Sequence, residues 1–484
     1  MVHEDCEPSG NTAKNSSAKS IHKPLGVFSL VMMNVMAVDS LRSLPVAAEF
    51  GYSLLFFYLL AAVFFFIPTA LVTAELATAW PSTGGAYIWI RNAFGARWGW
   101  FAIWLQWIYN VVWYPTILAF VIATMAYLFN PQLVHHKGFV LGLVLCIWWS
   151  VTGFSCLGLR VSSWFSSVGA LIGTLIPMFF IIALALFWIK SAKPLAIHFS
   201  SYALFPTLKD FKNLSFLTTI VFGLMGLEMS AVHAGDVHNP QKNYPRALLC
   251  SAGLILLTLM LGSLAIALIV PAGQLSLLTG LTDAYVVFFT SYHLEFLIPL
   301  LIALIIIGSL CSVSTWVIGP TRGLFIATAE SQISGLRWFL TLNRFGAPVN
   351  LLLLQGILVS LLASLFILIP TVNEAYWMLS VMTAQLAVLF YILLFLAALC
   401  LRYKEGHQAR VYRIPGGTIG IFFTTGLGLL TCLTIFIIGF FPPAVVTGSF
   451  FKFDSVLVLG ILFFCLPLYF IGRARRNNNE MEML

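Results

Sequence analysis

Two short stretches interrupt otherwise apolar runs, and they decide the fold. Residues 39–43 read Asp-Ser-Leu-Arg-Ser, and residues 223–228 read Gly-Leu-Met-Gly-Leu-Glu. We call them the first break and the second break. Each puts charged or helix-breaking residues inside a run long enough to cross a membrane. Charge at bilayer depth is costly and usually functional. Interrupted helices at matching places in two halves of a chain point to a substrate site near the membrane midplane.

The composition around the breaks is that of a membrane protein. Of the 484 residues, 60% are hydrophobic and 9% are charged, whereas an ordinary soluble domain is about 25% charged. About twelve apolar runs reach the length of ~18 residues that a membrane-spanning helix needs. They do not alternate in polarity as the strands of a transmembrane barrel do. The sequence therefore predicts an all-α polytopic membrane protein. The predicted spans are 26–47, 52–79, 97–129, 138–158, 161–189, 214–235, 247–271, 295–328, 349–370, 375–401, 417–441 and 454–472.

The chain has a net charge of +8, and the positions of its lysine and arginine residues explain this excess of positive charge. These residues are concentrated in alternate predicted loops and in the tails, as the positive-inside rule requires of cytoplasmic segments. This distribution explains the charge without nucleic acid, and it predicts that both termini are cytoplasmic. Termini on the same side of the membrane require an even number of spans, which agrees with the twelve predicted.

The breaks fall in the first and sixth spans, which predicts a repeat of five helices. The first copy covers about residues 26–189 and the second about residues 214–401. An odd number of helices per copy inverts the second copy in the membrane. Two further spans, in about residues 417–472, are appended. The transporter domain is thus residues 25–472, between a polar tail of residues 1–24, predicted to be disordered, and a short tail of residues 473–484, both cytoplasmic.

The first break offers groups for a zwitterion. A broken helix exposes backbone N–H groups on one side and carbonyls on the other, which suit a carboxylate and an ammonium group respectively. Asp39 and Arg42 lie three residues apart, so they could instead pair with each other as a structural ion pair. The sequence leaves both interpretations open. Ser40 has a weaker claim to contact a ligand.

In the second break, Gly223 and Gly226 lower the cost of leaving helical geometry. Glu228 follows directly. Burial favours the neutral form of a carboxyl group, so Glu228 is a candidate proton carrier or pH sensor. The alternative is that Glu228 only holds neighbouring helices together by hydrogen bonds.

Aromatic residues mark the spans expected to face the breaks. Aromatic walls can enclose a ligand and stack on a cationic amine. Hydroxyl groups surround Trp316 in the eighth span, and they form a candidate sodium site beside the first break. The aromatic candidates are Trp107, Trp113, Tyr114, Phe222 and Trp316, and the hydroxyl residues are Ser312, Ser314 and Thr315. The cysteines have no spacing typical of a zinc site or a disulfide framework.

Several short motifs together resemble the amino acid–polyamine–organocation (APC) superfamily, and most closely its bacterial glutamate/γ-aminobutyrate-type antiporters. The resemblance covers about residues 25–472 and rests on the order and spacing of the motifs. These are Met-Ala-Val at 36–38, Leu-Pro at 44–45, Phe-Ile-Pro at 66–68, Ala-Glu-Leu-Ala-Thr at 74–78, Gly-Gly at 84–85, Gly-Leu-Glu at 226–228, Asn-Pro at 239–240, Tyr-Pro at 244–245 and Trp-Val-Ile-Gly-Pro-Thr-Arg-Gly at 316–323.

The resemblance implies a LeuT-like fold of twelve helices, with substrate held at the two breaks. Asp39 and Ser40 match a substrate-binding pair of span 1, and Asn110 matches a binding asparagine of span 3. Phe222 matches an aromatic gate, Trp316 a substrate-stacking tryptophan, and Glu228 the family's carboxylate of span 6. The substrate-binding residues expected on this basis are Val38, Asp39, Ser40, Arg42, Asn110, Phe222, Gly226, Leu227 and Trp316.

The sequence therefore predicts a transporter of amino acids in the bacterial cytoplasmic membrane, working by alternating access as an exchanger. One alternative is uptake coupled to protons through Glu228 or to sodium at span 8. Another is an amino-acid sensor. Neither an enzyme nor a bound cofactor is expected, because no nucleophile or metal constellation and no nucleotide-binding loop is present. The expected partners are a small amino acid and the lipid bilayer, with a homodimer left open.

Overall fold

Helices make up the regular structure of this protein. The computed structural model describes residues 26–81, 84–157, 168–169, 171–197, 204–206, 214–237, 239–331, 334–443 and 450–469. Within these residues, ten helices are long and apolar enough to cross a membrane, and two shorter apolar helices, Phe216–Ala231 and Phe453–Tyr469, coincide with the predicted sixth and twelfth spans. The prediction of an all-α polytopic protein is confirmed.

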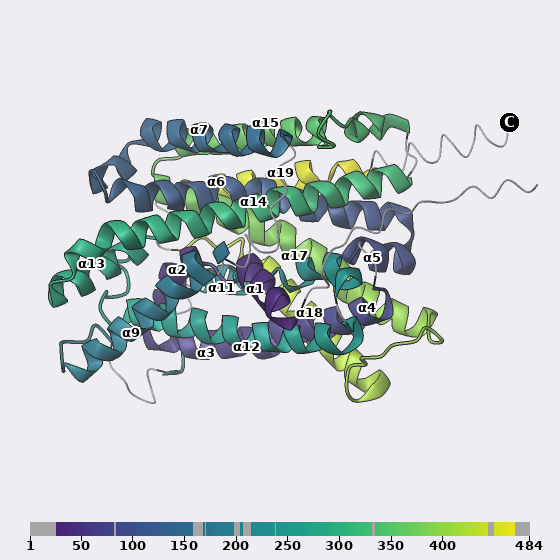
Figure 1. The fold of residues 1–484 in the computed structure, drawn as a ribbon, viewed down its shortest axis with the longest axis horizontal. Coiled ribbons are helices and arrows are strands. Elements are labelled where there is room, and N and C mark those ends of the chain that lie inside the picture. Colours follow the sequence, from purple (N-terminus) through teal and green to yellow (C-terminus); the bar gives the residue numbers. More distant parts are fainter. Residues whose placement is uncertain are drawn as a thin grey trace, which may run out of the picture.

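The spans follow the predicted order (Figure 1). The first five spans consist of α1 (Val27–Val38), η1 (Leu41–Ser43) and α2 (Leu44–Ala48); η2 (Gly51–Ser53), α3 (Leu54–Ala61), η3 (Ala62–Phe66) and α4 (Ile67–Ala79); α6 (Ala96–Ala126); α7 (Lys137–Cys156); and η5 (Leu171–Leu175) with α9 (Ile176–Lys190). The next five consist of α11 (Phe216–Phe222) and η7 (Leu227–Asp236); α12 (Pro240–Ala267); η8 (Glu295–Leu297) and α14 (Ile298–Ser331); α15 (Val349–Ala363) and α16 (Leu365–Leu368); and α17 (Val372–Lys404). The last two are α18 (Gly417–Ile438) and α19 (Phe450–Cys465), and the connections contain α5 (Ala86–Phe94), η4 (Pro131–His135), α13 (Gly280–Tyr292) and η9 (Ser334–Leu340).

The first break has a local cause in the sequence. The N–H of Asp39 still bonds to the carbonyl of Val35 at 2.8 Å, after which Asp39 and Ser40 are extended. The chain turns again in η1, and Pro45 occupies the first turn of α2. Proline has no N–H to donate, so it fits the start of a helix, where that donor has no partner in any case. The break therefore separates α1 from α2 within one span.

The second break depends on a glycine. Helix α11 ends at Phe222, and the chain resumes at Leu227 as the tighter 3₁₀-helix η7. Between them, Gly226 has a φ of +120°, a backbone conformation that residues other than glycine rarely adopt. A Cβ atom there would lie 3.3 Å from both Trp316 and Val38. Glycine thus lets the second break pass directly against α14 and the end of α1.

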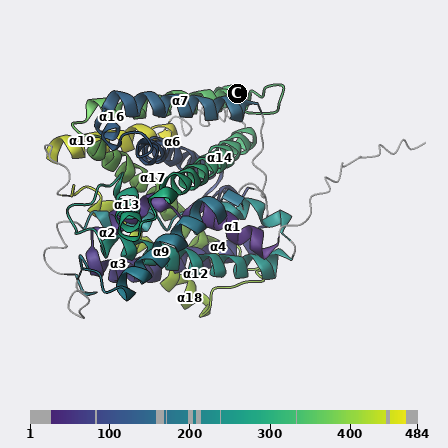
Figure 2. The ribbon, with the colours of Figure 1, turned by 60° about the vertical axis from the view of Figure 1, so that its left-hand side comes forward.

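The helices pack in layers, with α7 and α15 at one edge and α3 and α12 at the opposite edge (Figures 1 and 2). Helix α6 packs along both α14 and α17, and α7 packs on α15. Helices α1 and α2 pack on α12, and η7 packs on α4. In a five-helix repeat, span 1 corresponds to span 6 and span 2 corresponds to span 7. The contact between spans 1 and 7 therefore corresponds to the contact between spans 6 and 2. This is the pairing that a five-helix repeat generates. The boundaries of the two copies stay predictions.

Part of the predicted fifth span, residues 161–167 and 170, lies outside the described residues, as do both predicted tails. The described part of this span approaches α14 very closely. A Cβ atom on Gly173 would lie 2.2 Å from the Cα of Gly308, so only glycine at both positions allows the two backbones to touch. Small residues serve this purpose between membrane helices.

An ion cluster joins three segments at one end of the bundle. Glu75 on α4 lies 3.2 Å from Arg402 at the end of α17 and 3.4 Å from Arg410 in the following loop. The N–H of Ile414 donates to the same carboxylate at 2.8 Å. The cluster ties the end of the second span to the connection between the tenth and eleventh spans.

A second carboxylate, at the end of the first span, holds the connection between the seventh and eighth spans. Glu49 caps α2 and accepts a hydrogen bond from the N–H of Gly273 at 2.8 Å. The connection continues into α13, where Asp283 accepts hydrogen bonds from Tyr127 at the end of α6 and from Thr279. We call residues 271–292 the cover segment, because these bonds hold it against the ends of α2 and α6.

Candidate functional site

A cavity lies between the two breaks. Its empty volume is about 520 Å³, which includes open space at its mouth. Its walls come from α1, the first break, α6, the end of α11 with the second break, and α14. The lining residues are Met36, Ala37, Val38, Asp39, Ser40, Arg42, Ser43, Tyr109, Asn110, Trp113, Phe222, Gly223, Met225, Ser312 and Trp316.

Most of the predicted substrate-binding residues lie on this cavity. Gly226 and Leu227 do not line it, although Gly226 supports the wall by its approach to Trp316. Asn110 lines it, with its amide nitrogen donating to the carbonyl of Gln106 at 2.7 Å. The carbonyl of Ser40 is occupied by the hydroxyl of Ser43 at 2.7 Å. The structure thus brings together residues from spans 1, 3, 6 and 8, as the resemblance implies.

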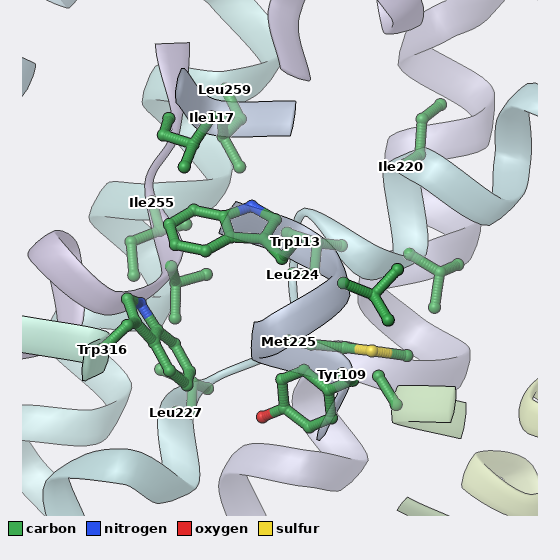
Figure 3. Packing of buried hydrophobic residues seen from close by; sticks show 14 of the residues in the cluster. Tyr109, Trp113, Ile117, Ile220, Leu224, Met225, Leu227, Ile255, Leu259 and Trp316 are labelled. Atoms are coloured by element: carbon green, nitrogen blue, oxygen red, sulfur yellow. The ribbon is translucent and has the colours of Figure 1, made fainter. Parts of the chain in front are cut away.

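Three aromatic rings that line the cavity, those of Tyr109, Trp113 and Trp316, lie near one another (Figure 3). The ring centroid of Trp316 lies 6.3 Å from that of Tyr109 and 6.4 Å from that of Trp113. Tyr109 was not a candidate from the sequence, although it lies one helical turn before Trp113 and next to Asn110. The three rings form a wall on which an amine or an apolar chain can pack.

The other two aromatic candidates pack elsewhere. The indole of Trp107 donates to Gln355 on α15 at 2.8 Å. Tyr114 stacks on Trp148 of α7 with centroids 4.6 Å apart. Both are outside the set of residues that line the cavity. These two residues fasten α6 to the layer formed by α7 and α15.

Asp39 is buried with half of its carboxylate unsatisfied. Its side chain is 4% exposed. Thr258 on α12 donates to Oδ2 at 2.9 Å, while Oδ1 has no hydrogen-bond partner. An unsatisfied buried carboxylate oxygen is expensive. Oδ1 therefore suits a donor that enters the cavity, such as an ammonium group.

Arg42 turns toward different helices. One nitrogen, Nη1, donates to Thr116 on α6 at 3.1 Å and to two hydroxyls of α17, Tyr376 at 3.1 Å and Ser380 at 3.4 Å. Its Nε has no partner. Neither Tyr376 nor Ser380 was a candidate from the sequence, which offered no site residue in the tenth span.

The interpretation of Asp39 and Arg42 as a structural ion pair is wrong. Both residues are described, and no ion pair joins them. The extended backbone at Asp39 and Ser40 directs the two side chains to α12 on one hand and to α6 and α17 on the other. Helical spacing, which would have put them on one face, does not apply across the break.

Glu228 lies behind the cavity wall in a small hydrogen-bond network. The hydroxyl of Tyr391 donates to Oε2 at 2.5 Å, and the amide of Gln106 lies 3.5 Å from Oε1. The backbone N–H of Gly226 donates to the same tyrosine hydroxyl at 2.7 Å. Glu228 thus does join neighbouring helices, as the alternative interpretation held. A role in proton transport stays a prediction.

The three hydroxyls of the candidate sodium site are directed differently. Ser314 and Thr315 donate to the carbonyls of Leu310 and Cys311 in their own helix, each at 3.0 Å. Ser312 donates to the carbonyl of Met36 at 3.3 Å and lines the cavity. It is the hydroxyl that bridges α14 to α1. The sodium site stays a prediction.

Comparisons with known proteins agree with this geometry. A family model described as "Amino acid permease" matches residues 25–464. The chain belongs to the amino acid permease family. A Legionella pneumophila protein described as an uncharacterized transporter is 49% identical to this permease, over 95% of the permease and 98% of its own length.

Two relatives from Lactococcus lactis have more specific descriptions. A "Glutamate/gamma-aminobutyrate antiporter" is 27% identical over 87% of the permease and 84% of its own length. A "Probable agmatine/putrescine antiporter" is 27% identical over 81% and 82% respectively. The family, the relatives and the apolar helices identify the permease as a multi-pass bacterial membrane transporter of a small molecule.

Proposed function

We propose that this permease carries amino acids across the bacterial cytoplasmic membrane by alternating access, as an exchanger. The observation that carries the proposal is the cavity between the two breaks, in which the buried side chains of Asp39 and Arg42 make no ion pair with each other. An amino acid brings an ammonium group that can pair with Asp39 and a carboxylate that can pair with Arg42. Both termini lie in the cytoplasm, where the basic loops belong.

The helix breaks supply the means of movement. Helix α1 ends at Val38 and α2 begins at Leu44, with an extended link between them. Helix α11 and η7 are separated by a turn that ends at Gly226. Each half can therefore tilt without the other, and the cavity opens first to one side of the membrane and then to the other.

Exchange is favoured because the buried charges of the carrier have counter-charges when a solute is bound and lack them when the carrier is empty. A buried, unpartnered charge costs free energy that a bound solute recovers. The empty permease would have to change conformation with Asp39 and Arg42 uncompensated. The antiporter descriptions of two relatives support the same mode. Asp39, Arg42, Asn110, Phe222 and Trp316 are the proposed contacts, with Val38 and Ser40 at the break.

Proton-coupled uptake is the second candidate, and one observation favours it. Glu228 is buried, and its carboxylate meets a tyrosine hydroxyl and an amide rather than a cation within the described residues. A carboxylate in such a place can take up and release a proton during the cycle. Under this mechanism net uptake would proceed without an amino acid on the far side.

Counterflow in liposomes tests these proposals. Purified permease is reconstituted into vesicles loaded with one unlabelled amino acid, and uptake of the same labelled compound is followed across a panel that includes γ-aminobutyrate. We expect uptake only into loaded vesicles. Protein-free vesicles are the control. Equal uptake into empty vesicles under an inward proton gradient would replace exchange by proton coupling. Binding without any transport would favour a sensor.

A further inference from the structure

Arg42 is a buried cation without an anion. Its side chain is 3% exposed. All three of its hydrogen-bond partners are neutral hydroxyls, and no ion pair of Arg42 occurs within the described residues. A guanidinium group carries five N–H donors. Here only Nη1 has hydrogen-bond partners in the described structure, and Nε is buried without one.

The hydroxyls around Arg42 add a further donor. Tyr376 and Ser380 receive the hydrogen bonds of Nη1 on their oxygen atoms, and Ser380 also lies in hydrogen-bond contact with Tyr376, so the O–H of Tyr376 is the donor that stays available. They lie four residues apart on α17 and therefore on one face of that helix. Thr116 differs, because it donates its hydrogen to the carbonyl of Trp113 at 2.7 Å.

Packing fixes the orientation of the guanidinium. Its Cζ lies 5.6 Å from the ring centroid of Tyr376 and 6.0 Å from that of Trp113. Aromatic faces stabilise a cation without satisfying its hydrogen-bond donors. Arg42 is thus held in place at the cavity wall, while donors for a planar, bidentate acceptor remain available.

We propose that Arg42, which lines the cavity and is held there by Tyr376 and Ser380 from outside the lining, forms a carboxylate-binding subsite, which admits amines that carry a carboxylate and excludes diamines. This subsite rests on the transport function proposed above and specifies its class of solute. The ammonium group of the solute lies at Oδ1 of Asp39, whose other carboxylate oxygen, Oδ2, accepts from Thr258 on α12. A diamine would satisfy Asp39 but would bring a second positive charge into a cavity that already holds Arg42.

The test compares acids with their amides. Proteoliposomes containing full-length permease are assayed by counterflow, with each compound of the panel as a competitor. The panel contains glutamate, glutamine, γ-aminobutyrate and its amide, an α-amino acid and its α-amide, agmatine and putrescine. For wild type we expect at least one acid to compete about tenfold better than its matched amide, and neither agmatine nor putrescine to compete. The matched pairs identify which carboxylate the subsite takes.

Variants assign this preference to the subsite. In Arg42→Gln we expect the preference for acid over amide to disappear, and in Tyr376→Phe and Ser380→Ala we expect it to fall several-fold. Arg42→Lys, which keeps the charge but loses the planar donor geometry, should retain part of it. Tyr285→Phe is the matched control, because it removes a buried tyrosine hydroxyl that bonds to Pro177 away from the cavity. It should leave the preference unchanged.

The outcomes separate the subsite from the transport function. No counterflow by wild type with any compound would refute the transport proposal itself. Counterflow in which agmatine or putrescine competes as well as the acids would overturn the subsite alone. So would an acid preference that stays at the wild-type level in both Tyr376→Phe and Arg42→Lys, variants chosen in case Arg42→Gln does not fold. Binding that depends on chloride but does not distinguish acids from amides would assign Arg42 to an inorganic anion instead.

Discussion

The hydroxyl of Tyr391 bonds to Glu228 and to the backbone of the second break at the same time. It donates to the carboxylate at 2.5 Å and accepts from the N–H of Gly226 at 2.7 Å. The N–H of a residue in a broken helix has lost its helical acceptor, and Tyr391 replaces it. One side chain of α17 therefore stabilises both the carboxylate and the unwound backbone in front of it.

Tyr391→Phe should destabilise the protein. The substitution removes the hydroxyl that bonds both to the N–H of Gly226 and to the carboxylate of Glu228, a loss of about 1–3 kcal/mol for buried groups. Thermal unfolding in detergent measures the effect. Tyr285→Phe is again the control, since it removes one hydrogen bond rather than two. Equal unfolding temperatures for the two variants would contradict the bridging role of Tyr391.

Glu228→Gln should flatten the pH dependence of exchange. Glutamine preserves the shape of the side chain and can accept from Tyr391, but it does not titrate. Exchange rates measured from pH 5 to pH 8 check this expectation. Gln106→Glu is not a suitable control, because it would add a second charge. If the variant keeps the wild-type profile, the titrating group lies elsewhere.

Trp316→Ala should weaken solute binding by about tenfold, or about 1.4 kcal/mol, because it removes one ring of the aromatic wall. The protein should remain monodisperse, since Trp316 lines a cavity rather than filling one. Affinity is measured on the purified variant. Trp316→Phe, which keeps a ring, should recover most of it. An unchanged affinity in the alanine variant would make Trp316 a packing residue.

Asp283 should make the cover segment sensitive to pH. Burial raises the pKa of Asp283 to about 6, from 3.8. A raised pKa means that the folded state binds the proton more tightly than the unfolded state does. The stabilising contribution is therefore fully present below about pH 4, and it is lost as the pH rises through 6.

Asp283→Asn should remove this part of the pH dependence. Unfolding of wild type and variant is compared at pH 4 and pH 7, and the wild type should lose more stability over that interval. Glu295→Gln, in η8 just beyond the cover segment, is a control for removing an acidic residue nearby. If the wild type loses no more stability than Asp283→Asn between pH 4 and pH 7, Asp283 does not make the cover segment sensitive to pH.

Asp39→Asn and Arg42→Gln should act almost independently on stability. Residues without a shared partner add their effects, whereas breaking a buried ion pair on one side costs about 3–5 kcal/mol that the double variant recovers. We expect a coupling energy below about 1 kcal/mol in a double-mutant cycle. The double variant should fold and should change its preference among anionic, neutral and cationic amino acids. A large coupling energy would restore the ion-pair interpretation.

The sequence predicted the positions of the breaks because their signals are local. Charge within an apolar run, or two glycines within four residues, is visible without any partner. The conformation of η7 was not predictable, since a tight 3₁₀-helix there depends on the close approach of Gly226 to Trp316 and Val38.

The contributions of α17 were missed for a similar reason. Tyr376, Ser380 and Tyr391 lie on an apolar helix where tyrosine and serine are ordinary, and no spacing distinguishes them. Their partners, Arg42 and Glu228, are far away in the sequence. The same holds for Thr258, which meets Asp39 only because α12 packs on the first span. Long-range packing, rather than local pattern, assigns these residues to the site.

The ion cluster around Glu75 also sets an order of events during synthesis. The ribosome makes the second span, with its buried carboxylate, long before Arg402, Arg410 and Ile414 emerge. Until the tenth span and the loop after it are complete, Glu75 lacks its partners. Closure of this cluster is therefore a late step of assembly, and a nascent chain that stops before residue 402 would carry Glu75 without its two arginine partners.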